Sequence, residues 1–89
     1  MDNNKMGAFI AQVRKERGLT QLELAQKINV TDKAVSKWER GVGFPDIKII
    51  EALAKALGVS VSEMMNGERM ENAVRAGESD NISNDDILT

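Results

Sequence analysis

The sequence predicts an all-α domain, and two kinds of local signal indicate it. Apolar residues recur at spacings of three and four in several short segments, as on the buried face of an amphipathic helix. Residues that start and stop helices separate these segments, with Thr20 and Thr31 as N-cap types and Gly18 and Gly58 suited to a left-handed end. The 89 residues, 42% of them hydrophobic, are enough for one core but not for two.

The first helix is expected over about residues 5–17. Gly18 would end it at the position after the C-cap. Its inward stripe is Met6, Phe9, Ile10 and Val13.

Two short helices joined by a turn are expected between Thr20 and Arg40. Thr20 is the expected N-cap of the first, with Glu23 three residues later as the acid of a capping box. Asn29 can adopt the left-handed conformation that ends this helix, and Thr31 is the expected N-cap of the next. The inward residues are Leu24, Ala25 and Ile28 in one helix, and Val35 and Trp38 in the other.

A fourth helix should begin near Asp46, directly after Pro45, and end at Gly58. A short fifth helix is expected over residues 61–65, with Ser60 as N-cap and Glu63 as its capping acid. The side chains expected in the core from the fourth helix are Ile47, Ile50, Leu53, Ala54 and Leu57. We expect one of Met64 and Met65 in the core and the other partly exposed.

Composition excludes several function classes. The chain has no cysteine and no histidine, which excludes disulfides, thiolate chemistry, histidine bases and the usual zinc ligand sets. No phosphate-binding glycine loop or metal cluster is evident, so we expect neither an enzyme nor a cofactor. There is no apolar run near 18 residues and no signal-peptide pattern, so the expected location is cytoplasmic, without a membrane partner.

Charge is divided unevenly along the chain. Residues 1–67 carry 10 basic and 8 acidic side chains, whereas residues 68–89 carry 2 basic and 6 acidic ones. We therefore expect a domain over 1–67 and a flexible acidic tail over 68–89. The tail is open to three interpretations: a docking segment, a subunit contact or the start of a further domain. Within the domain, Lys33, Lys37 and Arg40 fall on one predicted helix face, which suits DNA but also suits an ordinary solvated surface.

The chain resembles the lambda-repressor-like, or Cro/cI-type (XRE), helix-turn-helix family over roughly residues 5–67. The matching positions are Thr20-Gln21, Glu23-Leu24-Ala25, Val30-Thr31, Val35-Ser36, Trp38-Glu39, Gly41, Pro45 and residues 47–65. The resemblance implies a compact five-helix domain whose third helix, about 31–40, enters the DNA major groove. It also implies a homodimer, at least on DNA, bound to a pseudo-palindromic operator in double-stranded DNA.

The resemblance also implies roles for individual residues. Gln21 matches a position that binds phosphate, although a helix-start hydrogen bond is an alternative role. Asp32, Lys33 and Lys37 match positions that reach base edges, but Asp32 also suits the positive end of a helix dipole. The remaining implied DNA neighbours are Thr31, Ser36 and Arg40.

Arg14 and Glu39 match a pair that forms an interior ion pair in many members of the family. Neither residue would then touch DNA. The sequence thus predicts a sequence-specific DNA-binding transcription regulator, a repressor in the first interpretation. The alternative is an antitoxin-like protein-interaction module whose DNA binding serves autoregulation.

Overall fold

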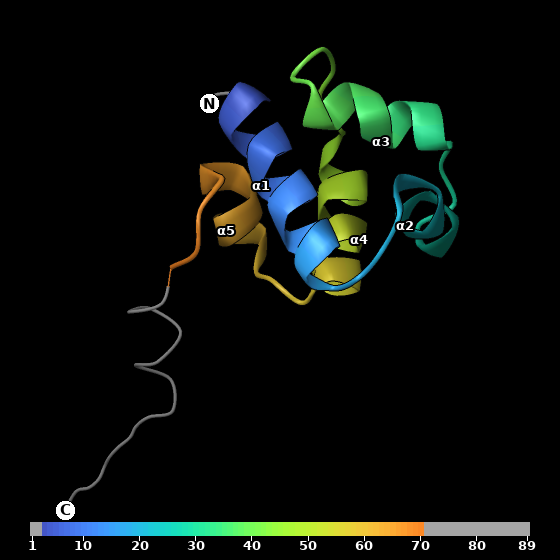
Figure 1. Cartoon of the computed structure of the whole chain (residues 1–89). Coiled ribbons are helices and arrows are strands. Elements are labelled where there is room, and N and C mark those ends of the chain that lie inside the picture. Colours follow the sequence, from blue (N-terminus) through green and yellow to red (C-terminus); the bar gives the residue numbers. More distant parts are fainter. Residues whose placement is uncertain (1–2, 71–89) are drawn as a thin grey trace, which may run out of the picture.

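The structure is a computed structural model that describes residues 3–70, and over these residues it is all-α. Short loops join the helices, and no strand is present in this part of the chain (Figure 1). The five helices are α1 (Asn3–Glu16), α2 (Gln21–Lys27), α3 (Asp32–Glu39), α4 (Ile47–Leu57) and α5 (Val61–Asn66). The expected fold class is confirmed, and each expected helix is present. Nearly all of the predicted tail, residues 71–89, lies outside the described residues.

The helices α2 to α5 begin at side-chain caps, of which Thr20, Thr31 and Ser60 were predicted as caps from the sequence. Thr20, Thr31, Asp46 and Ser60 each accept a hydrogen bond from the backbone N–H three residues on, at 2.9 to 3.1 Å. In α2 and α5 a glutamate completes a capping box by accepting from the N-cap backbone N–H. Each cap satisfies backbone donors that a helix start would otherwise leave unpaired.

The ends of α1 and α2 set the course of the helix-turn-helix hairpin. Gly18 has φ +72°, and the next amide, that of Leu19, donates to the Arg14 carbonyl at 3.0 Å. These two features close α1 in the manner of a Schellman motif. Asn29, at φ 58°, is the one non-glycine residue with positive φ in the described part of the chain. It reverses the chain between α2 and α3, as expected from its tolerance of this conformation.

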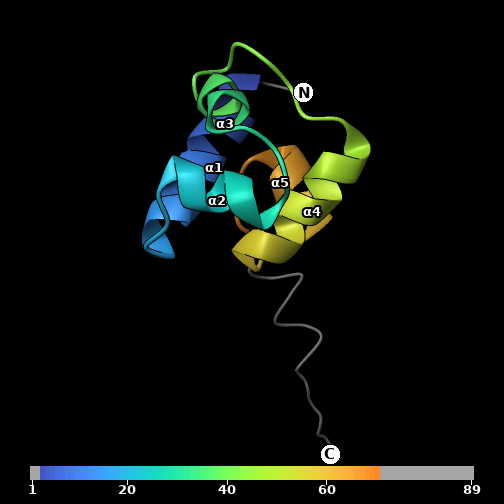
Figure 2. The ribbon, with the colours of Figure 1, turned by 90° about the vertical axis from the view of Figure 1, so that its right-hand side faces the viewer.

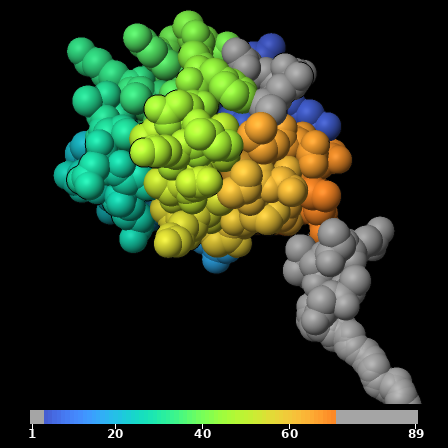
Figure 3. All heavy atoms as spheres, turned by 180° about the vertical axis from the view of Figure 1, so that it is seen from behind, coloured from blue at the N-terminus to red at the C-terminus, as the bar shows by residue number. Residues whose placement is uncertain are grey.

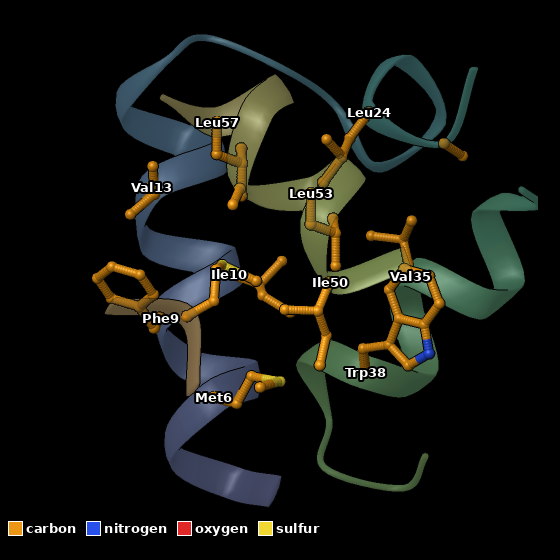
Figure 4. Close-up of a cluster of buried hydrophobic side chains, with 13 residues drawn as sticks. Met6, Phe9, Ile10, Val13, Leu24, Val35, Trp38, Ile50, Leu53 and Leu57 are labelled. Carbon is orange, nitrogen blue, oxygen red and sulfur yellow. The ribbon is translucent and has the colours of Figure 1, made fainter. Parts of the chain in front are cut away.

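One hydrophobic core joins all five helices (Figure 4). Ile10 and other side chains of α1 face those of α3 and α4 in this cluster, and Leu24 reaches it from α2. Met64 is fully buried, whereas Met65 is partly buried, as expected of that pair. The buried apolar residues are Met6, Phe9, Ile10, Val13, Leu24, Ala25, Val35, Trp38, Ile50, Leu53, Ala54, Leu57 and Met64.

Ile47 was expected in the core, and this prediction is wrong. Its side chain is 55% exposed. Ile47 is the first residue of α4, and the loop before it also exposes Val42 and Phe44, so neighbouring helices do not cover this end of the stripe. Helical periodicity gives the face of a residue, but it does not say how far along that face the neighbours extend.

Gly7 lets α1 pack directly on the end of α3. A Cβ atom at this position would overlap the Trp38 carbonyl oxygen and lie 2.9 Å from the Glu39 carbonyl oxygen. The two helix backbones are therefore in contact at this point. Figure 2 shows the resulting arrangement, with α3 and α2 on one side of the domain and α4 on the other.

Candidate nucleic-acid interface

The outward face of α3 is polar and basic. Lys33 and Lys37 are exposed, as is Arg40, which forms the C-cap of the helix. Val35 and Trp38 point the other way and are buried in the core. Burial of the apolar side therefore fixes the rotation of α3, and this rotation presents the three cations to solvent.

The start of α3 carries the one acidic side chain of this face. Thr31 is the N-cap, and its side chain accepts from the Ala34 backbone N–H at 3.1 Å. Asp32 follows as the first residue of the helix and is exposed. Its carboxylate lies at the positive end of the helix dipole, where a negative charge contributes about 0.3–1 kcal/mol. Asp32 has a structural role in this position whether or not it also reaches a base.

Ser36 and Arg40 interact with each other along the helix. The Arg40 guanidinium Nε donates to the Ser36 hydroxyl oxygen at 3.2 Å, on the exposed side. The bond draws the exposed Arg40 side chain back towards the middle of α3. The Ser36 hydroxyl keeps its own proton for donation to another acceptor.

A buried polar network holds α3 against α1. Arg14 forms a two-bond ion pair with Glu39, through Nε to Oε2 at 2.6 Å and Nη2 to Oε1 at 3.0 Å. Only 10% and 7% of these side chains are exposed. The hydrogen bond to Glu39 raises the pKa of Arg14, although burial opposes this shift. A third bond, from Nη1 to the Leu19 carbonyl at 2.8 Å, ties Arg14 to the loop before α2.

Gln21 joins the same network, which sequence reasoning did not anticipate. Its amide nitrogen donates to Glu39 Oε1 at 2.9 Å. Glu39 thus accepts from α1 and from α2 and fixes both to α3. The Gln21 amide has two N–H groups, so one remains for an acceptor outside the protein. The bond to Glu39 is therefore compatible with the phosphate role that the resemblance implies for this position.

The basic surface stops where α3 ends. The loop over residues 41–46 contains no Lys or Arg, and it exposes Val42 and Phe44. Ile47, at the start of α4, extends this exposed apolar surface. From its hydrophobic side chain alone, Ile47 was expected to be buried in the core.

The chain leaves the domain on the side away from α3 (Figure 1). Lys5 in α1 pairs with Glu68 at 3.3 Å, and Glu16 pairs with Arg69 at 2.6 Å. The Met70 amide donates to the Glu63 carboxylate at 3.0 Å. Contacts with the domain therefore continue three residues past the predicted boundary at residue 67.

Metal and membrane sites have no support in residues 3–70. In this part of the chain the acidic side chains do not gather into a group of three that would hold a metal ion. None of the described helices has the length and apolar character needed to cross a membrane.

The chain matches the helix-turn-helix family model over residues 10–64. This match includes α2, α3 and α4 in full and the second half of α1. The Arg14–Glu39 pair and every residue of the outward face of α3 therefore lie within the matched region.

Two proteins with similar sequences are named as regulators, one an activator and one a repressor. The chain is 33% identical over 75 residues to the transcriptional activator BcrR of Enterococcus faecalis, a match of 84% of this chain and 35% of BcrR. It is 38% identical over 65 residues to the immunity repressor of Bacillus phage phi105, a match of 73% of this chain and 45% of the repressor. The chain thus spans about a third to a half of the length of these relatives.

A solved structure shares both fold and sequence. The biofilm master regulator SinR, crystallised in complex with DNA, superposes with a TM-score of 0.64 at 36% identity. The superposition covers 67% of this chain and 97% of the SinR chain.

Proposed function

The chain belongs to the XRE-type helix-turn-helix family of transcription regulators, and from this we propose that it binds a specific DNA operator through the outward face of α3. In this proposal α3 enters the major groove, which is wide enough to admit a helix. Residues 1–67 carry the DNA-binding helices, and residues 68–89 are a tail whose first three residues contact α1 and α5. We place this activity in the cytoplasm.

The observation that carries the proposal is a basic helix face held rigidly by buried contacts. Lys33, Lys37 and Arg40 point outward because Val35 and Trp38 are buried on the opposite side. The Glu39 network and the contact at Gly7 fix α3 to the rest of the domain. A preorganised helix loses little conformational entropy on binding, which favours specific recognition.

Each side chain of the face has a proposed contact. Lys33 and Lys37 donate to guanine O6 and N7, and Asp32 accepts from a cytosine amino group. Arg40 and the free N–H of Gln21 bind phosphate, and these contacts set the register of the helix in the groove. Thr31 and Ser36 supply hydroxyl contacts to the backbone or to bases.

We further propose that the protein acts as a homodimer on a pseudo-palindromic operator and represses by occupying it. The similarity to a phage immunity repressor supports repression, whereas the similarity to BcrR, an activator, defines the competing outcome. In vitro transcription from a promoter that overlaps the recovered site distinguishes the two. Less transcript supports repression, and more transcript contradicts it.

The experiment that tests DNA recognition is selection from a pool of randomised duplexes with the full chain. Sites that are recovered are then titrated across salt concentrations. We expect one enriched motif, bound about 10³-fold more tightly than random DNA, with affinity that falls steeply as salt rises. The double variant Lys33→Ala/Lys37→Ala should lose the enrichment, whereas Lys15→Ala/Lys55→Ala, at exposed positions of α1 and α4, should keep it. An absence of enrichment with the parent chain would contradict the proposal.

A further inference from the structure

We propose that Val42, Phe44 and Ile47 form an apolar patch through which two copies of this chain meet on DNA. The inference rests on the proposed function and adds the surface that pairs the copies. It also predicts when they pair, because the patch is too small to hold a dimer together without DNA.

The patch is an unusual feature of the described surface. The side chains of Val42, Phe44 and Ile47 are 63%, 42% and 55% exposed, and they fall within six consecutive residues. Single exposed apolar residues are normal, whereas three within six residues of one loop and the helix start that follows it are a candidate interaction site. The other large hydrophobic residues exposed in residues 3–70, Leu22 and Val61, lie on different helices.

The patch lies beside the helix that is proposed to read DNA. Val42 comes two residues after Arg40, and its amide donates to the Lys37 carbonyl at 2.9 Å. A Cβ placed on Gly43 would lie 3.8 Å from the Lys37 Cβ and 3.9 Å from the Trp38 ring, so the loop rests directly on α3. Figure 3 shows this loop next to the first turns of α4 on one face of the domain. Contact through this face would couple two α3 helices closely.

The charged side chains around the patch favour a second copy of the chain as its binding partner, rather than DNA or a highly charged protein. Residues 41–47 contain no cation and one acid, Asp46, so the patch itself offers no side chain that binds phosphate. Asp46 and Lys48, both exposed, flank Ile47, and the exposed Lys37 and Arg40 lie at the α3 end of the loop. Across a two-fold axis the acid of one copy can face the base of the other, which is the self-complementarity that a symmetric dimer requires.

The size of the patch sets the conditions for pairing. A stable interface buries about 800 Å² per partner, more than three partly exposed side chains supply. On a duplex with two half-sites the neighbouring copy is held at a high effective concentration, so a small contact is enough. We therefore expect a monomer in solution at micromolar concentration and cooperative pairing on DNA.

The test compares duplexes that carry one or two copies of the selected half-site. The parent chain should bind the two-site duplex cooperatively. Phe44→Ser/Ile47→Ser should lower the two-site affinity about tenfold or more and keep the one-site affinity within about twofold. The matched control, Val61→Ser, removes an exposed apolar side chain of α5 and should leave both affinities unchanged. Thermal melting confirms that each variant folds.

Each outcome has a distinct meaning. Cooperativity that survives in Phe44→Ser/Ile47→Ser overturns the proposed role of the patch and leaves the proposed function intact.

Failure of the parent chain to select any site overturns the proposed function. The patch is then tested by crosslinking concentrated protein without DNA. Because the chain has no cysteine, Phe44→Cys and Val61→Cys are single-site probes for a short bismaleimide. Crosslinked dimer from Phe44→Cys and not from Val61→Cys supports the patch, and equal yields contradict it.

Discussion

Lysines on the outward face of α3 can act on DNA in two physically different ways, and single substitutions separate them. A lysine that donates to guanine contributes specificity at one base pair. A lysine that neutralises a phosphate contributes to affinity for every sequence. The two roles leave different signatures in salt titrations and in base preference.

Lys37→Ala should weaken binding to the selected site by about 1–3 kcal/mol and relax the base preference at one position. The reason is its central place on α3, where it is exposed between Lys33 and Arg40. Titration of the parent site and its single-base variants measures both effects. Lys55→Ala on α4 is the control and should change neither. A uniform loss across all sequences, with a smaller salt slope, would place Lys37 on phosphate instead.

Arg14→Met should destabilise the fold by about 3–5 kcal/mol. The substitution leaves the Glu39 carboxylate with a buried charge that only Gln21 partly satisfies. Urea unfolding followed by the fluorescence of Trp38 measures the change. Lys15→Met, at the exposed neighbouring position of α1, is the matched control and should stay close to the parent. Equal stability of Arg14→Met and the parent would show that the ion pair contributes nothing.

The sequence predicts local residue roles better than those that depend on packing. The caps Thr20, Thr31 and Ser60 follow from bonds to amides three residues away. The bond from Gln21 to Glu39 spans 18 residues and exists only because α2 packs against α3. The same is true of Ile47, whose exposure depends on where its neighbours end.

At the scale of helices, the contact between α1 and α3 depends on one missing side chain. Alanine is a better helix former than glycine by about 1 kcal/mol, so a solvent-facing glycine in α1 would favour replacement. Gly7 instead lies against the carbonyl groups that end α3. Nothing in the sequence around Gly7 reveals this, because the contact is with residues more than thirty positions away.

Gly7→Ala should therefore destabilise the domain by about 1–3 kcal/mol, against its helix propensity, because the new methyl group overlaps the α3 backbone. It should also weaken DNA binding, since α3 must shift to make room. The free energy of unfolding in urea measures the first effect, and titration of the selected site measures the second. Ala8→Gly reports the propensity effect alone at the exposed neighbouring position. A Gly7→Ala variant more stable than the parent would contradict the close contact.

At the scale of the whole molecule, acid should loosen the region where the chain leaves the domain. Backbone hydrogen bonds from Ser60 and Met70 lower the pKa of Glu63, and the hydrogen bond from Arg69 lowers the pKa of Glu16. A carboxylate with a lowered folded pKa stabilises the fold above its unfolded pKa, about 4.3 for glutamate. That stabilisation disappears as pH falls through the folded pKa.

The free energy of unfolding should therefore be level above about pH 5 and fall below about pH 4.3. Glu63→Gln removes one of the titrating groups and keeps a side chain that can complete the capping box. We expect a smaller fall on acidification for this variant than for the parent, measured by urea unfolding at pH 7 and pH 3.5. Parallel pH profiles for the two proteins would show that Glu63 does not contribute.

The family and the all-α fold were predictable from sequence because capping signals, apolar periodicity and a matching motif all indicated the same arrangement. The patch at Val42, Phe44 and Ile47 was not predictable, since its meaning depends on which surfaces the helices leave uncovered.

The central claim is that α3 reads bases in the major groove, and chemical interference on the selected duplex tests it most directly. Dimethyl sulfate methylates guanine N7 in the major groove and adenine N3 in the minor groove. The account predicts that N7 methylation blocks binding at guanines in each half-site, about one helical turn apart, and that Lys37→Ala removes one of these effects. Interference confined to adenine N3, or absent from both grooves, would contradict it.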